Sequence, residues 1–202
     1  MAQRVLACTG CHGKEGRAAS DGYYPRIAGK PAGYLFNQLQ ALRDGRRPYA
    51  PMAKLLAPLS DDYLREIAGH FAALELPYPA PAPARAAAAS LLVGERLPLE
   101  GDAARGVPAC RACHGAALTG VAPAIPGLLG LPADYLGAQL GAWRTRQRAS
   151  LAPDCMAQVA QRLAPHEIAA VAQWLAAQPQ PASTKPAPAR SAELPMACGG
   201  VP

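Results

Sequence analysis

Two Cys-x-x-Cys-His motifs occur in this 202-residue chain, in the segments ACTGCHGKEG and ACRACHGAAL. Two residues between the cysteines place both thiols near one edge of a flat ligand, and the following histidine turns its imidazole toward the ligand's centre. This geometry suits thioether attachment of haem, with the histidine as axial iron ligand. We therefore expect two covalently bound haem c groups, one on Cys8, Cys11 and His12 and the other on Cys110, Cys113 and His114.

Two other chemistries use similar motifs. A structural zinc ion needs four ligands, and neither half of the chain has a second local pair of cysteine or histidine residues. A thioredoxin-like redox pair needs a βαβ context, and no such pattern is present. Covalent haem is therefore the favoured interpretation, with zinc and redox thiols as the alternatives.

Methionine is scarce, with only four residues in the chain. Met52 and Met156 occupy equivalent positions after the two motifs, on segments that contain proline and that we expect to be loops. We predict that they are the second axial ligands of the two irons. Met196 is the rival for the second iron, whereas Met1 lies too close to the first motif.

Further residues in matching positions could support the two sites. Pro25 and Pro126 follow the two histidines, and a backbone carbonyl there could accept a hydrogen bond from the second imidazole nitrogen. An ordinary loop proline is the alternative. Candidate partners of the haem propionates, which could equally be plain surface residues, are Tyr34, Tyr135, Arg47 and Arg148.

Two cysteines lie outside the motifs. An exported haem protein meets an oxidising compartment, where Cys155 and Cys198 could form a disulfide that holds the end of the chain beside Met156. Two unpaired thiols are the alternative. Cys155 could also ligate the second iron itself, but its neighbour Met156 aligns with Met52.

These residues lie in an internal duplication. The segment GYLFNQLQALRDGRR (33–47) matches DYLGAQLGAWRTRQR (134–148), and LSDDYLREIAGHFAAL (59–74) matches LAPHEIAAVAQWLAAQ (163–178). Leucines recur at helical spacing in the first pair, and Ser60 and Pro165 are typical of helix starts. We predict an all-α fold of two tandem copies, each around one haem.

Proline-rich segments divide the chain. LPYPAPAPARAAAA is predicted to be an extended, semi-rigid spacer, since repeated X-Pro disfavours helix. A similar stretch follows the last helix. We therefore expect a first domain over 1–75, a linker over 76–89, a second domain over 90–178 and an extended tail over 179–202.

Composition narrows the function. Aromatic residues make up only 5% of the chain, so its protein core is thin unless a buried cofactor fills it. The sequence has no stretch of about 20 apolar residues, so no membrane span is predicted. The net charge of +6 comes without a long basic run interleaved with aromatics, which argues against nucleic acid as a partner. Arginines clustered at 43–47 and 144–148 could instead steer acidic protein partners.

With CTGCHG and CRACHG, each followed by a YLxxQLxxxRxxxR helix, a methionine and a closing helix, the chain resembles the dihaem class I cytochromes c of the cytochrome c4 type. The resemblance implies a periplasmic carrier that feeds a terminal oxidase and associates peripherally with the membrane. Its donor would be a quinol-oxidising complex or a dehydrogenase. The resemblance also implies His/Met ligation at both irons, which leaves no site for a substrate, so we do not expect an enzyme.

Two other functions are compatible with this pattern. The chain could be the dedicated cytochrome subunit of one periplasmic dehydrogenase. It could also be a dihaem enzyme, such as a peroxidase or a thiosulfate-oxidising cytochrome, if one iron is open. The family pattern also has a helix before each motif, which Ala89 to Leu97 can supply in the second half. The first half has only MAQRVLA, without an export signal, and we expect that Met1 is not the natural start.

Overall fold

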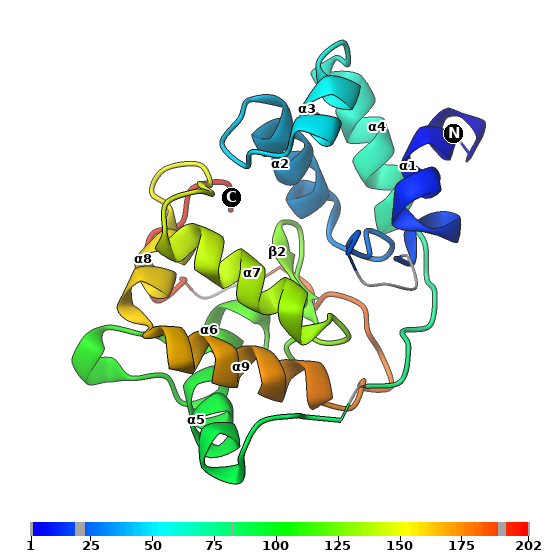
Figure 1. Ribbon diagram of the computed structural model, residues 1–202. Helices are drawn as coiled ribbons and strands as arrows, with labels where there is room; N and C mark the ends of the chain where they lie inside the picture. Colours follow the sequence, from blue (N-terminus) through cyan, green and yellow to red (C-terminus); the bar gives the residue numbers. More distant parts are fainter. Residues whose placement is uncertain (1, 19–22, 82, 190–192, 202) are drawn as a thin grey trace.

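The chain folds into two helical halves that pack side by side (Figure 1). The computed structural model describes residues 2–18, 23–81, 83–189 and 193–201. The α-helices of the first half are α1 (Leu6–His12), α2 (Ala32–Arg43), α3 (Ala50–Leu56) and α4 (Asp61–Ala72). Those of the second half are α5 (Ala88–Leu99), α6 (Cys110–His114), α7 (Ala133–Arg144), α8 (Cys155–Arg162) and α9 (Pro165–Ala177). Short 3-10 turns cover Ala2–Val5, Lys14–Gly16 and Ala103–Arg105. The predicted all-α fold of two tandem cytochrome c-like domains is confirmed.

The first half is built on the packing of α2 against α4. The Ser60 side chain caps α4 by accepting a hydrogen bond from the backbone N–H of Tyr63 at 3.3 Å, as the sequence predicted. Apolar side chains recur on the inner faces of both helices at helical spacing. The buried set is Val5, Leu35, Leu42, Leu56, Leu64, Ile67, Ala68 and Phe71.

The second half is organised around α9, which packs against both α5 and α7. Gly94 of α5 meets Ala170 of α9 so closely that an added Cβ would lie 2.3 Å from the Ala170 carbonyl oxygen. In the first half, Glu66 holds the position that matches Ala170 and forms an ion pair with Arg4 at 2.9 Å. The two halves therefore differ at this position. In the second half α5 packs closely against α9, whereas in the first half the matching position of α4 carries an ion pair with Arg4.

A small hairpin joins the two halves. Strands β1 (Gly120–Val121) and β2 (Ile125–Pro126) are antiparallel and were not predicted. The backbone N–H of Gly33, at the start of α2, donates to the carbonyl oxygen of Pro123 at 2.9 Å. A Cβ at Gly33 would lie only 2.8 Å from that oxygen, so glycine permits this close approach of the two halves.

The C-terminal tail runs back across both halves. Val121 and Ala187 form a parallel bridge, and Cys198 is joined to Cys155 of α8 by a disulfide. Beyond the disulfide, Asn37 Nδ2 of α2 donates to the carbonyl oxygen of Gly200 at 2.7 Å. Figure 1 shows the end of the chain lying near α2 and α8. The tail therefore fastens the second half to the first.

Several local expectations need adjustment. Met52 and Met156 lie in the first turns of α3 and α8, not in loops, because the proline-containing segments end just before or within those turns. The helix expected from Ala89 to Leu97 is α5, which starts at Ala88 inside the expected 76–89 linker. Met1, residue 82 of the linker and residues 190–192 and 202 of the tail lie outside the described residues.

Membrane insertion was also considered. Every helix in the described part of the chain is too short or too polar to cross a membrane.

We predict that Gly94→Ala lowers the free energy of unfolding of the second half by about 1 to 3 kcal/mol, because the new methyl group must push α5 away from α9. The matched control is Gly69→Ala in α4, where the added Cβ has no neighbour within 4 Å. That control should be neutral, or stabilising by up to about 1 kcal/mol, from helix propensity. Thermal and denaturant unfolding followed by circular dichroism would measure both, and equal effects would contradict the close packing.

We predict that the double variant Cys155→Ser/Cys198→Ser unfolds more easily by about 2 to 4 kcal/mol, because the disulfide closes a loop with a sequence separation of 43 residues. Denaturant titration of the haem-loaded protein measures the change. The single salt-bridge variant Lys185→Met removes another tail contact, with Glu75, that is largely exposed, and should change little. An unchanged unfolding curve of the double variant would contradict a stabilising tail.

Candidate functional site

Both Cys-x-x-Cys-His motifs lie on short helices, α1 and α6, with the histidine as the last helical residue. Residues three and four positions apart share one face of a helix, so the two thiols and the imidazole of each motif project to the same side. The next residue, Gly13 or Gly115, has φ of 75° or 85°, which glycine adopts without a Cβ clash. Each motif is thus a compact three-point attachment site.

Each motif histidine is buried and held by a backbone carbonyl. His12 Nδ1 lies 2.8 Å from the Pro25 oxygen, and His114 Nδ1 lies 2.8 Å from the Pro126 oxygen. Nδ1 donates in both bonds, which leaves Nε2 with a free lone pair that can bind a metal. Burial lowers the pKa of both imidazoles, so the neutral, metal-binding form dominates at neutral pH. The hydrogen bonds expected from the sequence are therefore present in both halves.

The motif cysteines do not resemble a redox pair or a zinc site. Burial raises the pKa of Cys110 to about 12 and also raises that of Cys8. A reactive Cys-x-x-Cys pair needs the opposite shift, toward the thiolate. In the described residues, no group of three or more His, Cys, Asp and Glu could hold a metal ion. Paired cysteines that line a cavity directly before a histidine are instead suited to thioether attachment of haem.

The candidate ligands of both halves line one continuous cavity of about 1030 Å³. A typical pocket for one small ligand has roughly 300–1,000 Å³. The motif residues come from α1 and α6, and Met52 and Met156 come from α3 and α8. The rival Met196 also lines this cavity, from the tail. Cys155 forms the disulfide, so its sulfur is not available as an iron ligand.

Two arginines meet at the middle of the cavity, one from each half. Arg47 donates to Gln38 at 3.0 Å, to Gln139 at 2.8 Å and to the Tyr135 hydroxyl at 3.3 Å. Arg148 donates to Gln38 at 2.6 Å and also to Gln139. Each guanidinium therefore binds the glutamine of its own half and the glutamine of the other half, which couples the two domains through a symmetric cluster.

This cluster is charged, and among the described residues no carboxylate is recorded as a hydrogen-bond or ion-pair partner of its two arginines. Arg148 is only 4% exposed, and burial together with Arg47 lowers its pKa to about 10. Two guanidinium groups in a buried site are costly without a negative partner. Beside them, Nε1 of Trp143 is buried without a hydrogen-bond partner, and Arg148 lies 3.8 Å over the Trp143 ring. Two cations and an orphaned donor facing one cavity fit the carboxylates of haem.

Sequence reasoning missed three kinds of residue here. Gln38 and Gln139 were visible as a matched pair in the repeats, but their cross-domain hydrogen bonds depend on how the halves dock. Trp143 matches Leu42, so nothing in the repeat pattern marked its indole N–H. Lys30 matches Leu131, and its burial at the junction of the halves gives no periodic signal.

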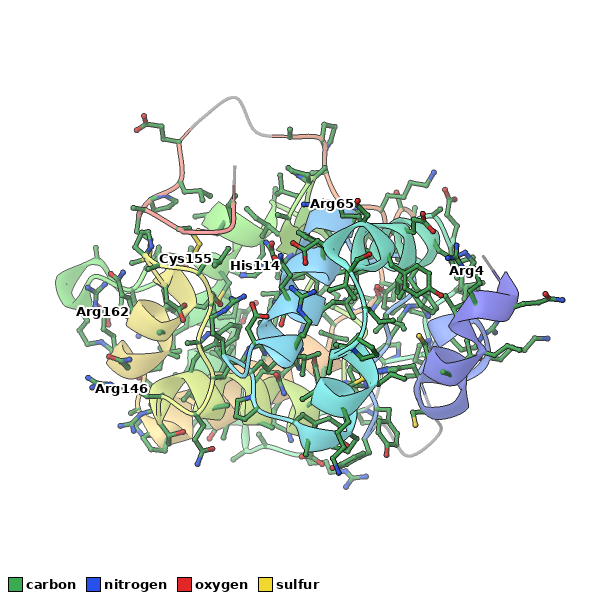
Figure 2. The ribbon with its side chains drawn as sticks, turned by 90° about the horizontal axis from the view of Figure 1, so that it is seen from above. Arg4, Arg65, His114, Arg146, Cys155 and Arg162 are labelled. Atoms are coloured by element: carbon green, nitrogen blue, oxygen red, sulfur yellow. A yellow bond between two sulfur atoms is a disulfide. The ribbon has the colours of Figure 1, made fainter. Side chains whose placement is uncertain are left out.

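The sequence suggested that the two arginine clusters steer acidic partners, but only some of these arginines face the surface. Arg47 and Arg148 face the interior, and Arg43 pairs with Asp61 at 2.7 Å. Figure 2 shows Arg146 and Arg162 at the outer end of the second half, whereas Arg4 and Arg65 lie on the first half. Exposed arginines near the second site include Arg111 on the motif helix α6, as well as Arg146 and Arg162 around α8.

Comparison with known proteins gives a consistent result. No protein-family model matches the chain. The chain is 42% identical over 175 residues to the thiosulfate dehydrogenase electron acceptor of Thiomonas intermedia, covering 87% of this chain and 80% of that one. It is 32% identical to cytochrome c4 of Pseudomonas aeruginosa, covering 85% and 84% of the two chains.

Solved structures extend the comparison to the fold. The crystal structure of reduced recombinant cytochrome c4 from Pseudomonas stutzeri has a TM-score of 0.74 and 29% identity, over 87% of this chain and 95% of that one. Thiosulfate dehydrogenase (TsdBA) from Marichromatium purpuratum, in its as-isolated form, has a TM-score of 0.76 and 32% identity, over 88% of this chain. The chain spans only 37% of that longer protein.

Proposed function

We propose, from the premise that this chain belongs to the cytochrome c4 family of dihaem cytochromes c, that it accepts electrons from a thiosulfate dehydrogenase. The chain carries two covalent haem c groups and acts in electron transfer, not as an enzyme. The observation that carries the choice of donor is the 42% identity to a thiosulfate dehydrogenase electron acceptor, against 32% to a cytochrome c4.

The proposed attachment residues are the cysteines of the two motifs, with His12 and His114 as the axial nitrogen ligands. Support comes from the shared helix face of each motif and from the two Nδ1 hydrogen bonds, which orient Nε2 toward the cavity. Met52 and Met156 are the proposed sulfur ligands, because both line the cavity from matching short helices. Once bound, each haem supplies a one-electron couple.

The proposed partners of the haem carboxylates are Arg47, Arg148 and Trp143, with Tyr34 and Tyr135 beside them. Support comes from the unbalanced positive charge of the arginine pair and from the orphaned Trp143 Nε1. Tyr135 already accepts from Arg47 at 3.3 Å, so its own hydroxyl proton is available for a further acceptor. These side chains would exclude water from the junction and keep the two sites at a fixed separation.

Two saturated sites in one cavity give the chain a simple mechanism. The protein positions each redox group, shields it from water and leaves no ligand position for a substrate. Burial together with methionine ligation raises a haem reduction potential. A chain with two one-electron sites can take up both electrons that a two-electron oxidation releases. We place it in the periplasm, loosely associated with the membrane, with a terminal oxidase as the acceptor.

The donor is tested by rapid mixing of the oxidised, haem-loaded chain with a catalytic amount of thiosulfate dehydrogenase and thiosulfate. We expect haem reduction far faster than with thiosulfate alone. A quinol-oxidising complex with its quinol serves as the competing donor in a parallel reaction. Reduction by that complex alone would overturn the choice of donor, although the chain would remain an electron carrier.

We predict that Met156→Ala removes the ferric absorption band of methionine–iron ligation from one haem and lets carbon monoxide bind rapidly to that haem when reduced. Met196→Ala is the matched control, because Met196 also lines the cavity but lies in the tail. The control should keep both methionine bands. Loss of a band in Met196→Ala, with Met156→Ala unaffected, would transfer the ligand role to Met196.

We predict that reduction by the dehydrogenase slows as ionic strength rises, because exposed arginines of the second half steer an acidic partner. Arg146→Glu should lower the association rate roughly 10-fold at low salt and reduce its salt dependence. Arg65→Glu is the control, since Arg65 is exposed but lies on the other half (Figure 2). Stopped-flow rates across a salt series measure both, and rates indifferent to salt would contradict steering.

A further inference from the structure

Lys30 is a buried cation that the duplication does not explain. It is only 5% exposed, and the matching position of the second half is the core residue Leu131. Burying an ammonium group costs several kcal/mol unless a carboxylate compensates for it, so such lysines are rare without a role. Lys30 directly precedes Pro31, the cap of α2, and therefore has a fixed backbone position.

The surroundings of Lys30 are cationic and apolar. Its Nζ donates to the carbonyl oxygen of Gly127 at 3.3 Å and lies 5.9 Å from the centre of the Tyr78 ring. Arg26 stacks on the same ring, with its Cζ 3.9 Å from the ring centre. Burial, with a contribution from Arg26, lowers the pKa of Lys30 to about 8, which leaves it mostly charged at neutral pH.

The hydrogen bond of Lys30 crosses from the first half to the second. Gly127 follows Pro126, whose carbonyl oxygen holds Nδ1 of His114 at 2.8 Å. A residue of the first domain thus delivers a positive charge to the backbone segment that orients the proposed ligand of the second.

No lysine corresponds to Lys30 at the first haem site. Its histidine, His12, is held by Pro25, and Leu131 occupies the position from which a second lysine would act. Arg47 adds a positive charge near His12, but Arg47 has a counterpart in Arg148 at the shared cluster. Lys30 is therefore a buried cation near one histidine that the repeat does not balance at the other.

We propose that Lys30 is a positioning residue that raises the reduction potential of the haem on His114. The oxidised site carries one more positive charge than the reduced site, and a cation nearby in a poorly polarisable interior disfavours the oxidised form. This inference rests on the proposed ligand role of His114.

The test compares Lys30→Met, which removes the charge, with Lys30→Arg, which keeps it. Both haem-loaded variants are titrated by spectroelectrochemistry at neutral pH, and each potential is assigned from the paramagnetic NMR signals of its methionine ligand. In Lys30→Met we expect the second-domain haem to favour oxidation on the order of tenfold more, equivalent to about 59 mV. The potential of the first-domain haem should not move, and Lys30→Arg should stay near the wild type.

Three results would overturn the inference: unchanged potentials in Lys30→Met, an equal shift at both haems, or the same shift in Lys30→Arg. Lys185→Met controls for loss of a lysine charge, because Lys185 is exposed in the tail. If Lys30→Met does not fold, Lys30→Gln replaces it in the comparison. Failure of the proposed ligation would be visible separately, as fewer than two haems or a missing methionine band in the unaltered protein.

Discussion

The helices of both halves line one cavity of about 1030 Å³, and the stability of the fold depends on the groups that fill this cavity. The buried apolar side chains form one cluster in each half, and Phe71 is the largest fully buried side chain. Cores with so few aromatic side chains are thin unless a cofactor adds to them. Covalent attachment at two thiols and two axial bonds would join two separate segments of each half, the motif helix and the methionine helix, which is how a short chain with few aromatics can fold.

The same cavity also explains the junction between the halves. Arg47 and Arg148 each bind Gln38 and Gln139, so four side chains hold the two domains in a fixed orientation. Hydrogen bonds among neutral amides and cations do not neutralise the charge. An anion in the cavity would offset this charge, which would link docking of the domains to binding of the proposed haem groups. The tail adds a mechanical link through Cys198 and Gly200.

Local and repeated features were predictable from the sequence, whereas contacts between the repeats were not. The helices followed from apolar periodicity and from caps such as Ser60, and the contacts of both histidines followed from the matched prolines Pro25 and Pro126. Gly33 and Pro123 illustrate what did not follow: their hydrogen bond depends on how two rigid domains meet, which no periodic pattern records. The short hairpin that contains Pro123 was not predicted either, because two-residue strands are too short to show an alternating pattern.

Positions at which the two halves differ therefore indicate how the two sites differ. Positions that match in both halves, such as the motif residues and the arginine pair, have roles that the two proposed haem sites share. Positions that differ separate the two sites: Trp143 stands against Leu42, and Lys30 against Leu131. Both unmatched polar groups lie beside the second site or the junction, where a charge or donor in a dry interior has a large electrostatic effect. Under the proposal for Lys30, a charge from the first half acts on one of two similar sites, so the two copies need not have equal reduction potentials.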